Sequence, residues 1–528
     1  MTSRVYDGDW VVSRLLEDRA SRLGDALAIT ADEGRWSYAE LGDEAARVAG
    51  FLGDLGIEPG DRVATMLDTS LAYVAAWFGI VWAGAVDVPV NTELKGTFLE
   101  HVLHDSGARA LVVDARWAER LDGLDVPELK HVIIVDGPAE PPQGLATHAF
   151  DDARAHTAVA PIHRSETDIV YLMYTSGTTG PSKGVIHTNR SSLWYVQPFR
   201  RQLGWREGDV VYCNFPLFHQ MGRSSMTTTA LWEGATVALR PHFSASRFWE
   251  DVRGLGATIF GYLGAVLLML DTAEPRDDDQ ENPLRVGFGA AAPPDLKQRF
   301  ETRFGVVLLE NYGSTECGVP AFAMPDDVKH GTMGRPAWYL DVRIHDEHDR
   351  PVPPGQRGEI VVRPREAEAI FRGYWNRPDA TLGAFRNLWF HSGDEGYLDE
   401  DGYLVYTDRL KDSIRRRGEN ISSFEVERAM QAHPAVVECA AYAVPSELTE
   451  DEVMVALLLS EPRAASAHEL FQYAIDTIPR FAVPRYLRIV DELPRTASHR
   501  VRKHLLRDEG VTADTSDRQA LDMELPRG

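Results

Sequence analysis

Strand-like and helix-like segments alternate along the first third of this chain, and the alternation strongly constrains its fold. Short apolar runs at residues 27–30, 62–66, 110–113 and 131–135 have the character of buried strands, and residues 38–55 have helical periodicity. This pattern is typical of layered α/β domains with parallel strands. We therefore predict an α/β fold with parallel layers for the large N-terminal part of the chain.

The pattern changes near residue 340, where turn-rich sequence replaces the helices. Residues 341–344 and 359–363 predict antiparallel hairpins in a small barrel-like section. A chain of 528 residues is too long for one core, and the charged stretch 407–412 is a candidate hinge. We expect an N-terminal domain (1–409), a small mobile α+β lid domain (410–510) and a disordered polar tail (511–528).

Composition argues against several partners and locations. The formal net charge is −25, whereas nucleic-acid binding needs a positive face. The three cysteines are widely spaced without a C-x-x-C motif, which suits a reducing compartment. The N-terminus lacks the pattern of a signal peptide, and the uncharged run 71–86 is shorter than the ~20 residues of a spanning helix. We expect a cytoplasmic protein, with this run as a buried helix.

A loop rich in glycine and hydroxyl groups follows the apolar run 169–173. Residues 174–185 read Tyr-Thr-Ser-Gly-Thr-Thr-Gly-Pro-Ser-Lys-Gly-Val. Glycines let backbone N–H groups turn toward an anion, hydroxyls add donors, and a lysine adds a point charge. The spacing differs from a Walker A loop, in which lysine directly follows glycine. The loop predicts a phosphate site with these candidates: Thr175, Ser176, Gly177, Thr178, Thr179 and Lys183.

The same loop also satisfies G-x-S-x-G around Ser182, the pattern of a hydrolase nucleophile elbow. This alternative leaves the run of hydroxyl residues unexplained. It also places Pro181 where such an elbow must bend sharply from strand into helix. A hydrolase is therefore the least favoured reading.

Together with motifs downstream, the loop resembles the signature loop of the adenylate-forming superfamily, which includes acyl-CoA synthetases, adenylation domains of peptide synthetases and luciferases. The resemblance covers roughly residues 10–508, with the motifs in the expected order. Residues 71–77, 371–375 and 416–422 look most like medium-chain and carnitine-type acyl-CoA ligases. The resemblance implies ATP and Mg²⁺ as cofactors and CoA as co-substrate.

The segment Asn311–Glu316 resembles the second superfamily motif. By this resemblance Tyr312 stacks on adenine, Thr315 binds the α-phosphate and Glu316 helps to hold Mg²⁺, with Asn311 and Gly313 in the same nucleotide site. A preceding segment resembles the strand end that contacts adenine, and it contributes Gly289, Ala290 and Ala291.

Further motifs are assigned by the same resemblance. Asp394 is expected to bind the ribose hydroxyls, Arg409 to face the ribose, and Lys411 to be the residue whose backbone rotates at the hinge. Gly418 belongs to the loop that swings against the pantetheine tunnel in CoA ligases. His219 occupies the position of the residue that gates the acyl pocket.

The C-terminal motif departs from the superfamily pattern. Most members end in P-R-T-x-x-G-K, and that lysine reaches the carboxylate and the α-phosphate during adenylation. Here His499 stands in place of the glycine and Arg500 in place of the lysine. Arginine is a wider, always charged fork rather than a compact point charge. Three interpretations stay open: Arg500 does the same work, Lys503 compensates, or the activated group is not an ordinary carboxylate.

The leading hypothesis is an ATP-dependent, AMP-forming ligase that adenylates a carboxylic acid and transfers the acyl group to CoA. One alternative keeps adenylation but changes the acceptor or the activated group: carrier-protein loading, amide formation, or a nitrite-activating diazotase that acts on an aryl amine. A non-catalytic nucleotide-binding protein is a remote alternative. The acyl pocket is expected near 215–219, 260–264 and 290–292, and Phe260 and Tyr262 favour an apolar or aromatic acid. A homo-oligomer or a carrier-protein partner is left open.

Overall fold

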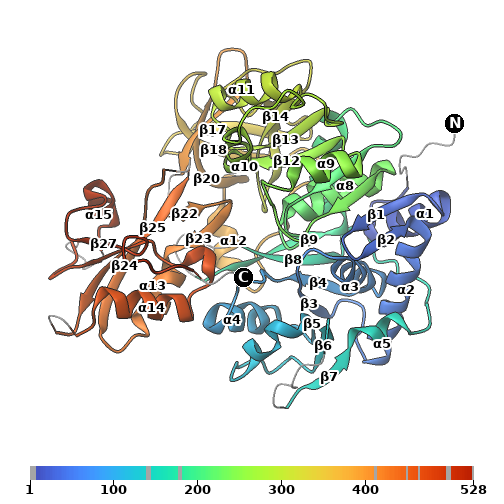
Figure 1. The fold of residues 1–528 in the computed structure, drawn as a ribbon, viewed down its shortest axis with the longest axis horizontal. Coiled ribbons are helices and arrows are strands. Elements are labelled where there is room, and N and C mark those ends of the chain that lie inside the picture. The colour runs from blue at the N-terminus through green and yellow to red at the C-terminus, as the bar shows by residue number, and fades with distance from the viewer. Residues whose placement is uncertain are drawn as a thin grey trace.

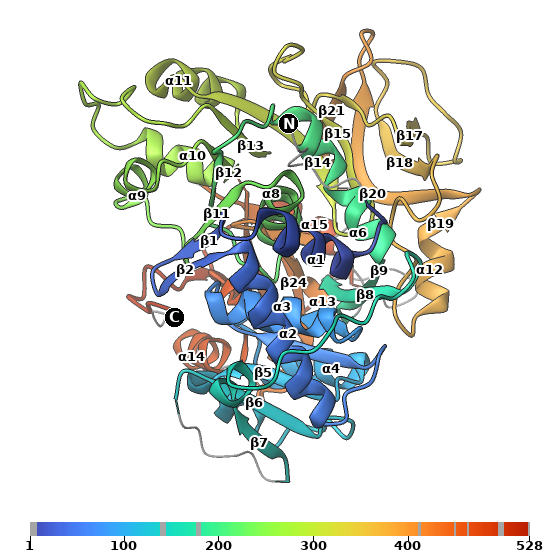
Figure 2. The same cartoon turned by 90° about the vertical axis from the view of Figure 1, so that its right-hand side faces the viewer.

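The computed structural model describes residues 8–137, 144–175, 181–409, 413–447, 450–461, 464–494 and 501–525. Figure 1 shows the N-terminal elements, blue to light orange, in a large body, and the darker orange to red C-terminal elements in a smaller lobe beside it. The view from the side shows the C-terminal elements behind the sheets of the large body (Figure 2).

One sheet of the large body has the strand order β7-β6-β5-β3-β4-β8-β9. Its strands pair in parallel, except that β8 and β9 form an antiparallel pair. The parallel layers predicted from the alternation are confirmed. The strands are β3 (Arg62–Met66), β4 (Val86–Pro89), β5 (Ala110–Asp114), β6 (His131–Val135), β7 (Ala146–Ala149), β8 (Ile169–Thr175) and β9 (Lys183–Thr188).

A second sheet has the order β16-β15-β14-β13-β12-β10-β11-β1-β2. Its central strands β10 to β14 are parallel, so their carboxyl ends meet at one edge. The strands are β1 (Leu27–Ala31), β2 (Gly34–Ser37), β10 (Val210–Cys213), β11 (Thr236–Leu239), β12 (Ile259–Leu263), β13 (Val286–Ala290), β14 (Val307–Ser314), β15 (Gly318–Phe322) and β16 (Arg335–Pro336).

Helices pack between and around these sheets. Burial of nearly every residue of α3 (Leu71–Trp82) explains its uncharged sequence, and it lies next to α2, which begins at a Ser37–Glu40 capping box. The other helices are α1 (Val12–Leu23), α2 (Tyr38–Asp54), α4 (Gly96–Ser106), η1 (Ala115–Leu121), α5 (Phe150–Arg154), α6 (Asn189–Tyr195), α7 (Gln197–Gln202), η2 (Met221–Thr228), α8 (Thr229–Glu233), α9 (Phe248–Leu255), α10 (Gly264–Asp271) and α11 (Pro294–Phe304). Among the described residues, no helix is long and apolar enough to cross a membrane.

An antiparallel section follows, as the turn-rich sequence predicted. Its strands pair in the order β17-β18-β20-β19, and β21 pairs with β20. The elements are β17 (Leu340–His345), β18 (Gly358–Pro364), α12 (Pro378–Ala384), β19 (Phe385–Arg386), β20 (Trp389–Leu398) and β21 (Leu404–Arg409). Residues 410–412 of the expected hinge lie outside the described residues.

The C-terminal lobe combines a hairpin, a separate sheet and helices. The hairpin is β22 (Ser413–Arg416) and β23 (Glu419–Ser422), and the sheet has the order β24-β25-β26-β27. An apolar core lies between this sheet and the helices α13 and α14, and Phe98 of α4 in the large body packs into it. The other elements are α13 (Ser423–Gln431), β24 (Val436–Pro445), β25 (Asp451–Leu459), α14 (Ala467–Thr477), η3 (Arg480–Ala482), β26 (Tyr486–Ile489), α15 (Lys503–Glu509) and β27 (Thr515–Asp517).

The described part of the predicted disordered tail is ordered. Residues Thr515–Asp517 form β27 and pair with β26, and Met523 packs into the core of the C-terminal lobe. Arg485 forms an ion pair with Asp517 at 3.3 Å. Polar composition suggested disorder, but it did not account for an edge strand that has a sheet to join.

Candidate active site

A cavity of about 240 Å³ lies where the two sheets and the C-terminal hairpin meet. The ends of β8, β13 and β14 form its wall in the large body, and β22–β23 closes it from the other side. In α/β folds, ligands bind at the carboxyl ends of the parallel strands. The cavity lining includes these predicted residues: Thr175, His219, Gly289, Ala290, Asn311, Gly313, Thr315 and Gly418.

Groups suited to phosphate and a cation gather at one corner of the site. Thr175 and Lys183 are directly paired across the β8–β9 hairpin. The Thr175 hydroxyl donates to Glu316 Oε1 at 3.4 Å, and the Tyr374 hydroxyl donates to the same oxygen at 3.1 Å. The Lys183 ammonium lies 4.9 Å from the centre of the Tyr374 ring. Burial and the Glu316 carboxylate raise the pKa of Tyr374, so its hydroxyl stays a donor.

The opposite wall contains two glycines and one unpaired side-chain amide. Both polar side-chain atoms of Asn311 are buried without a hydrogen-bond partner in the described protein, and the residue lines the cavity. A Cβ at Gly289 would lie 1.9 Å from the Tyr262 carbonyl, and one at Gly313 would lie 2.4 Å from the Gly318 carbonyl. Glycine is therefore required at both positions. An unpaired buried amide beside a wall with glycines fits a planar, hydrogen-bonding ligand such as a nucleobase.

The aspartate and tyrosine expected at the ribose and the adenine contact each other. The Tyr312 hydroxyl donates to Asp394 Oδ2 at 2.8 Å, and both residues are buried beside the cavity rather than in its lining. Arg409 is the backbone partner of Asp394 across β20 and β21. The structure thus brings these three positions together next to the site.

Other predicted residues lie elsewhere or outside the described residues. Ser176, Gly177, Thr178, Thr179, Lys411 and Arg500 fall outside the described part of the chain. Lys503 is held within the C-terminal lobe, where its Nζ lies 2.6 Å from Glu427 Oε1 and 2.8 Å from Ser423 Oγ. Ala291 has a positive φ of 61°, and its carbonyl packs against Gly264, so it shapes the wall from behind.

A buried histidine that sequence reasoning missed supports the predicted catalytic loop. His187 Nε2 lies 2.8 Å from the carbonyl oxygen of Thr315, and Nδ1 lies 3.2 Å from Ser191 Oγ. Burial lowers the pKa of His187 to about 4, which keeps the ring neutral. The ring also stacks on Tyr171 with centroids 4.7 Å apart. His187 therefore ties β9 to the loop that carries Thr315 and Glu316.

A buried ion pair lies behind the same wall. Arg223 Nη2 is 2.6 Å from Asp87 Oδ2, and the two side chains are 1% and 0% exposed. The guanidinium also lies 4.0 Å from the Trp77 ring centroid and 5.0 Å from that of Tyr171. Burial raises the pKa of Asp87 against the lowering effect of Arg223. This pair links η2 to β4 and fixes the start of η2, which follows His219.

The apolar end of the cavity differs in part from the prediction. Phe215 and His219 line it as expected, but Phe260 and Tyr262 are fully buried in a separate core cluster, where the Tyr262 hydroxyl donates to Glu310. The reason is strand alternation, because these side chains point to the far face of the sheet. The lining is instead completed by residues that sequence reasoning missed: Tyr195, Phe199, Met221, Ser225 and Val319.

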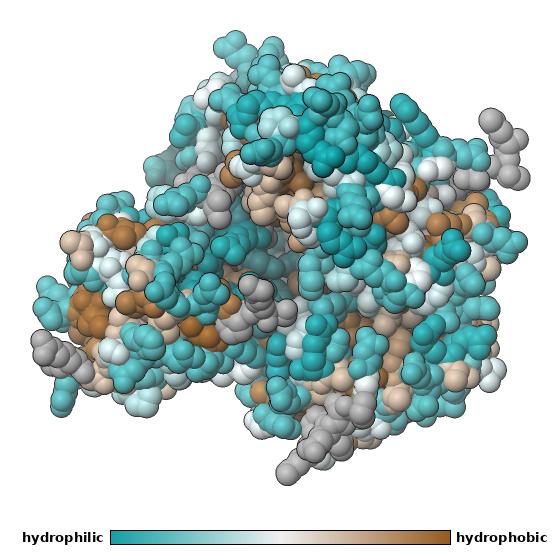
Figure 3. All heavy atoms as spheres, viewed as in Figure 1, coloured by the Kyte–Doolittle hydropathy of each residue, from teal (hydrophilic) through white to brown (hydrophobic). Residues whose placement is uncertain are grey.

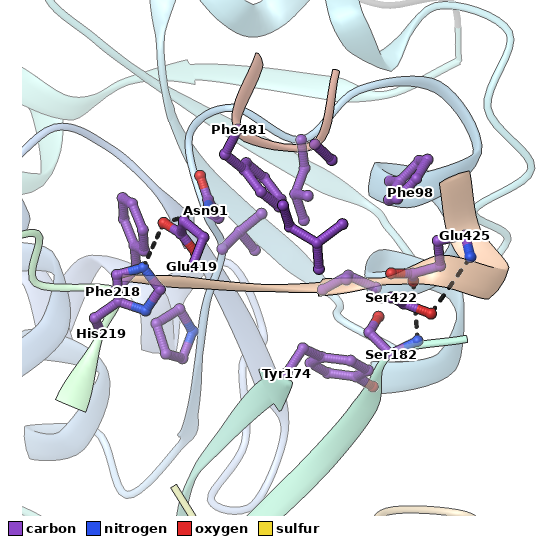
Figure 4. Close-up of a pocket in the computed structure, with 16 residues that line it drawn as sticks. Asn91, Phe98, Tyr174, Ser182, Phe218, His219, Glu419, Ser422, Glu425 and Phe481 are labelled. Atoms are coloured by element: carbon purple, nitrogen blue, oxygen red, sulfur yellow. Dashed lines mark hydrogen bonds and ion pairs between the residues drawn. The ribbon is translucent and has the colours of Figure 1, made fainter. Parts of the chain in front are cut away.

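The C-terminal hairpin contacts this site directly (Figure 4). His219 Nε2 lies 2.8 Å from Glu419 Oε1, and Asn91 Nδ2 lies 3.4 Å from the same oxygen. Gly418 has a φ of +84°, and a Cβ there would lie 2.5 Å from Leu263. Burial lowers the pKa of His219, but the charge and hydrogen bond of Glu419 outweigh it, so the pKa is raised.

A second cavity of about 660 Å³ lies between the large body and the C-terminal lobe. It shares five lining residues with the first cavity: Phe215, His219, Leu263, Gly418 and Glu419. Figure 3 shows a hollow between the C-terminal lobe and the upper part of the large body. The two cavities together form a route from the domain interface to the loop that carries Thr315 and Glu316.

The surroundings of Ser182 exclude a nucleophile elbow. Ser182 precedes β9 in an antiparallel hairpin with β8, whereas the elbow needs a strand followed by a helix. His101 Nε2 contacts the Ser182 carbonyl oxygen at 2.7 Å rather than the hydroxyl. The Ser182 N–H donates to Glu425 Oε1 at 2.9 Å (Figure 4). This residue therefore contributes to domain docking.

The fold and the site define a two-domain α/β enzyme whose cavity has a wall with glycines, a corner with Thr175, Lys183 and Glu316, and an apolar end. The AMP-binding enzyme family matches residues 16–375, and the AMP-binding enzyme C-terminal domain matches residues 425–500. Within the described ranges, histidine, cysteine and carboxylate groups form no cluster of three that could hold a metal. Magnesium in phosphate-transfer sites is typically held by one or two carboxylates plus substrate phosphates, so Glu316 fits this role.

Known proteins agree with this match along nearly the whole chain. Crotonobetaine/carnitine–CoA ligase of Escherichia coli O7:K1 is 32% identical over 89% of this chain and 93% of its own length. The o-succinylbenzoate CoA synthetase of Bacillus subtilis, bound to a product analogue, superposes with a TM-score of 0.82 at 26% identity, over 94% of this chain and 98% of that one. The amide bond synthetase McbA of Marinactinospora thermotolerans gives 0.81 at 25% identity, over 94% and 99%.

This chain therefore belongs to the AMP-binding enzyme family. The adenylate-forming resemblance read from the motifs is confirmed, as is its likeness to carnitine-type CoA ligases.

Proposed function

We propose that this enzyme is an ATP-dependent, AMP-forming acid–CoA ligase. It joins a carboxylic acid to AMP with release of pyrophosphate, and then transfers the acyl group to the thiol of CoA. The observation that carries the proposal is the pair of cavities that meet at Phe215, His219, Leu263, Gly418 and Glu419. One cavity presents the catalytic loop, and the other offers a long acceptor a route between the domains.

In the first step, the large body positions the reacting groups. Thr175, Lys183 and Thr315 would hold the phosphates, and Glu316 would hold Mg²⁺, which neutralises phosphate charge as pyrophosphate leaves. The unpaired Asn311 amide would bind the base. His187 fixes the Thr315 carbonyl, so the loop needs little reorganisation.

The acid is a compact apolar or aromatic carboxylic acid. The apolar end is lined by the rings of Tyr195, Phe199 and Phe215 and closed by Met221 and Val319. The 240 Å³ of the cavity must also accommodate part of the nucleotide, which leaves room for a short acyl group only.

In the second step, the C-terminal lobe supplies part of the site. The structure has the β22–β23 hairpin in the cavity and Lys503 paired with Glu427. This arrangement suits transfer, because the hairpin rather than the C-terminal motif faces the acyl site.

A second candidate keeps adenylation but uses an amine as acceptor. The similarity to an amide bond synthetase is nearly as close as that to the CoA synthetase. The second cavity is lined by four carboxylates, Glu419, Glu450, Asp451 and Glu452, against two guanidinium groups, Arg416 and Arg417, and this acidic excess suits a cationic or polar amine better than a phosphate.

The test is pyrophosphate release from Mg-ATP with a panel of aliphatic acids, aryl acids, and nitrite plus an aryl amine, each with and without CoA. Mass spectrometry identifies the products. We expect an acyl-CoA from a compact acid. An amide, or turnover with nitrite and no acyl-CoA, would replace the ligase with the second candidate or with a different activated group.

A further inference from the structure

The residues that separate the two cavities include an acid–base pair formed by both domains. His219 comes from the large body, directly before η2, and Glu419 comes from the C-terminal hairpin, 200 residues further along the chain. His219 Nε2 and Glu419 Oε1 are 2.8 Å apart, and the side chains are 37% and 21% exposed. Both residues line both cavities, so the pair lies where an acceptor would meet an acyl adenylate (Figure 4).

The position of His219 is fixed by the large body. Its N–H donates to the Pro216 carbonyl at 3.1 Å, and its own carbonyl accepts from Arg223 N–H at 2.9 Å. A Cβ at Gly222 would lie 2.5 Å from the carbonyl oxygens of Phe215 and Pro216, so the bend there is tight. The imidazole is thus held on a rigid support, as a catalytic group requires.

The other titratable groups around the first cavity are poor proton acceptors. Tyr174 and Tyr195 line it, but burial raises the pKa of each phenol, so both stay protonated. Arg415 lines it as a cation and pairs with Glu450 at 3.4 Å. Among the described lining residues, His219 is the imidazole, the side chain that ordinarily exchanges a proton near neutral pH.

We propose that His219 is the general base of the transfer step and that Glu419 is its orienting partner, so that this dyad is complete only when the C-terminal lobe is docked. The inference rests on the proposed acyl transfer. A neutral His219 donates its Nε2–H to Glu419, which leaves the Nδ1 lone pair for the acceptor. No hydrogen bond within the described protein occupies Nδ1. This is the arrangement of a base held in one tautomer by a carboxylate.

The step balances without a further reagent. The acceptor sulfur attacks the acyl carbon of the mixed anhydride while its proton passes to His219 Nδ1. The acyl carbon–oxygen bond to AMP then breaks, and AMP leaves with the electron pair as a phosphate anion. Glu419 stabilises the imidazolium until the proton returns to water. The products are thioester, AMP and one proton.

The pair also explains why the hairpin enters the site. The raised pKa of His219 depends on Glu419, so undocking of the hairpin lowers it and removes the orienting bond. The other charged groups near His219 are mostly paired with one another. They are Arg415 with Glu450, Arg416 with Glu452, His242 with Asp68, Asp451 with the Arg415 N–H, Glu93 with the Phe481 N–H, and the exposed Arg417 of the hairpin turn.

The test separates transfer from adenylation. The transfer rate is measured in single-turnover experiments in which enzyme is mixed with synthetic benzoyl-AMP and CoA at a series of pH values, roughly from 5.5 to 9. ATP–pyrophosphate exchange, measured separately, reports on adenylation. His219→Gln should lower the transfer rate about 10²-fold or more, a larger loss than in exchange, for which His219 only lines the acyl cavity. In Glu419→Gln, the acid limb of the transfer profile should move to lower pH, because the His219 pKa falls.

The matched control is Glu425→Ala. Glu425 Oε1 accepts the Ser182 N–H at 2.9 Å, so this variant loosens domain docking without touching the dyad. It should lower transfer without moving the pH profile. The proposed dyad would be wrong if Glu419→Gln lowered the transfer rate by the same factor at every pH, as the control variant should. It would also be wrong if His219→Gln transferred as fast as the wild type, the result expected of a residue that is only a steric gate.

A second measurement works without any substrate. The pKa of His219 is read by NMR titration of ring-labelled histidine in the wild-type full chain and in Glu419→Gln, with His219→Gln to assign the signal. We expect a lower pKa in Glu419→Gln. An unchanged value would overturn the pairing, even if no acyl-CoA forms in the substrate panel. An enzyme that ignores benzoyl-AMP and the whole acid panel, but shows the NMR shift, would refute the ligase and keep the pair.

Discussion

The two walls of the active cavity are held in place by different means. In the large body, the catalytic loop is fixed by fully buried groups: His187 binds the Thr315 carbonyl, and the Asp87–Arg223 pair lies behind it. The polar contacts that hold the C-terminal wall, such as His219–Glu419 and Glu425–Ser182, are partly exposed. The difference suggests that adenylation uses a permanent site, whereas transfer uses a site that is assembled by docking.

Removal of the buried cation should have the largest effect. Arg223→Met leaves Asp87 buried and unpaired, which should lower the unfolding free energy of the large body by about 3–5 kcal/mol. Chemical denaturation followed by tryptophan fluorescence measures this. A loss below about 1 kcal/mol, the range of exposed pairs, would contradict the idea that the large-body wall is fixed by this pair.

Replacement of Glu316 should affect chemistry rather than folding. Glu316→Gln removes the carboxylate beside Thr175 and Tyr374, and ATP–pyrophosphate exchange should fall about 10²–10³-fold. Glu347→Gln is the matched control, because its side chain is 87% exposed in a turn far from the cavity. Equal activities in the two variants would remove Glu316 from the site.

The stability of the large body should fall in acid through His187. Its folded pKa of about 4 lies below the ordinary 6.5, so the unfolded chain binds the extra proton between these values. Stability is therefore fully present above pH 6.5 and is lost as the pH falls toward 4, by roughly 3 kcal/mol for this residue. The loss should be smaller in His187→Gln than in the wild type. Denaturation midpoints of the wild type and of His187→Gln are measured across this pH range. If the two midpoints fell in parallel with pH, the argument from the burial of His187 would be contradicted.

Addition of a methyl group to the C-terminal hairpin should impair docking of the C-terminal lobe and leave adenylation intact. In Gly418→Ala, the new residue is strained at a positive φ, and its Cβ contacts Leu263 in the docked arrangement. Transfer from acyl-AMP should fall about tenfold, since overpacking against Leu263 arises only in the docked arrangement and typically costs about 1–3 kcal/mol. Pyrophosphate exchange should be kept. A loss of both activities would mean that the two walls are not independent.

The smallest effect is expected at the rim of the interface. Glu425→Gln keeps an oxygen that can accept the Ser182 N–H but removes its charge. Transfer should change by less than about fivefold, because partly exposed charges contribute little. A much larger loss in a transfer assay would show that this contact controls docking.

Much of the fold was predictable because local patterns decide it. The runs at 27–30, 62–66, 110–113 and 131–135 lie in β1, β3, β5 and β6, and the predicted helix 38–55 is α2 within one residue. Glycine positions in the cavity wall were also readable, since strands approach too closely for a side chain.

The remainder depends on contacts between distant segments. His187 and Thr315 are 128 residues apart, and His219 and Glu419 are 200 apart, so no spacing rule connects them. The residues that line the acyl pocket depend on the face of the strand from which each side chain projects. Phe260 and Tyr262 point into a core, whereas Tyr195 and Phe199 of the helical layer reach the cavity. The edge strand β27 was missed because pairing with β26, not composition, orders it.

The three cysteines, Cys213, Cys317 and Cys439, are all buried. Burial raises the pKa of Cys213 and of Cys317 to about 12, and that of Cys439 is raised as well. Maleimide dyes need an accessible thiolate, so the native protein should remain unlabelled. Cysteines can therefore be introduced at the exposed positions Ser246 and Glu447, on opposite sides of the domain interface, and labelled with a donor and an acceptor dye. Single-molecule energy transfer between the dyes would follow each docking event. The three native cysteines would not need to be removed first.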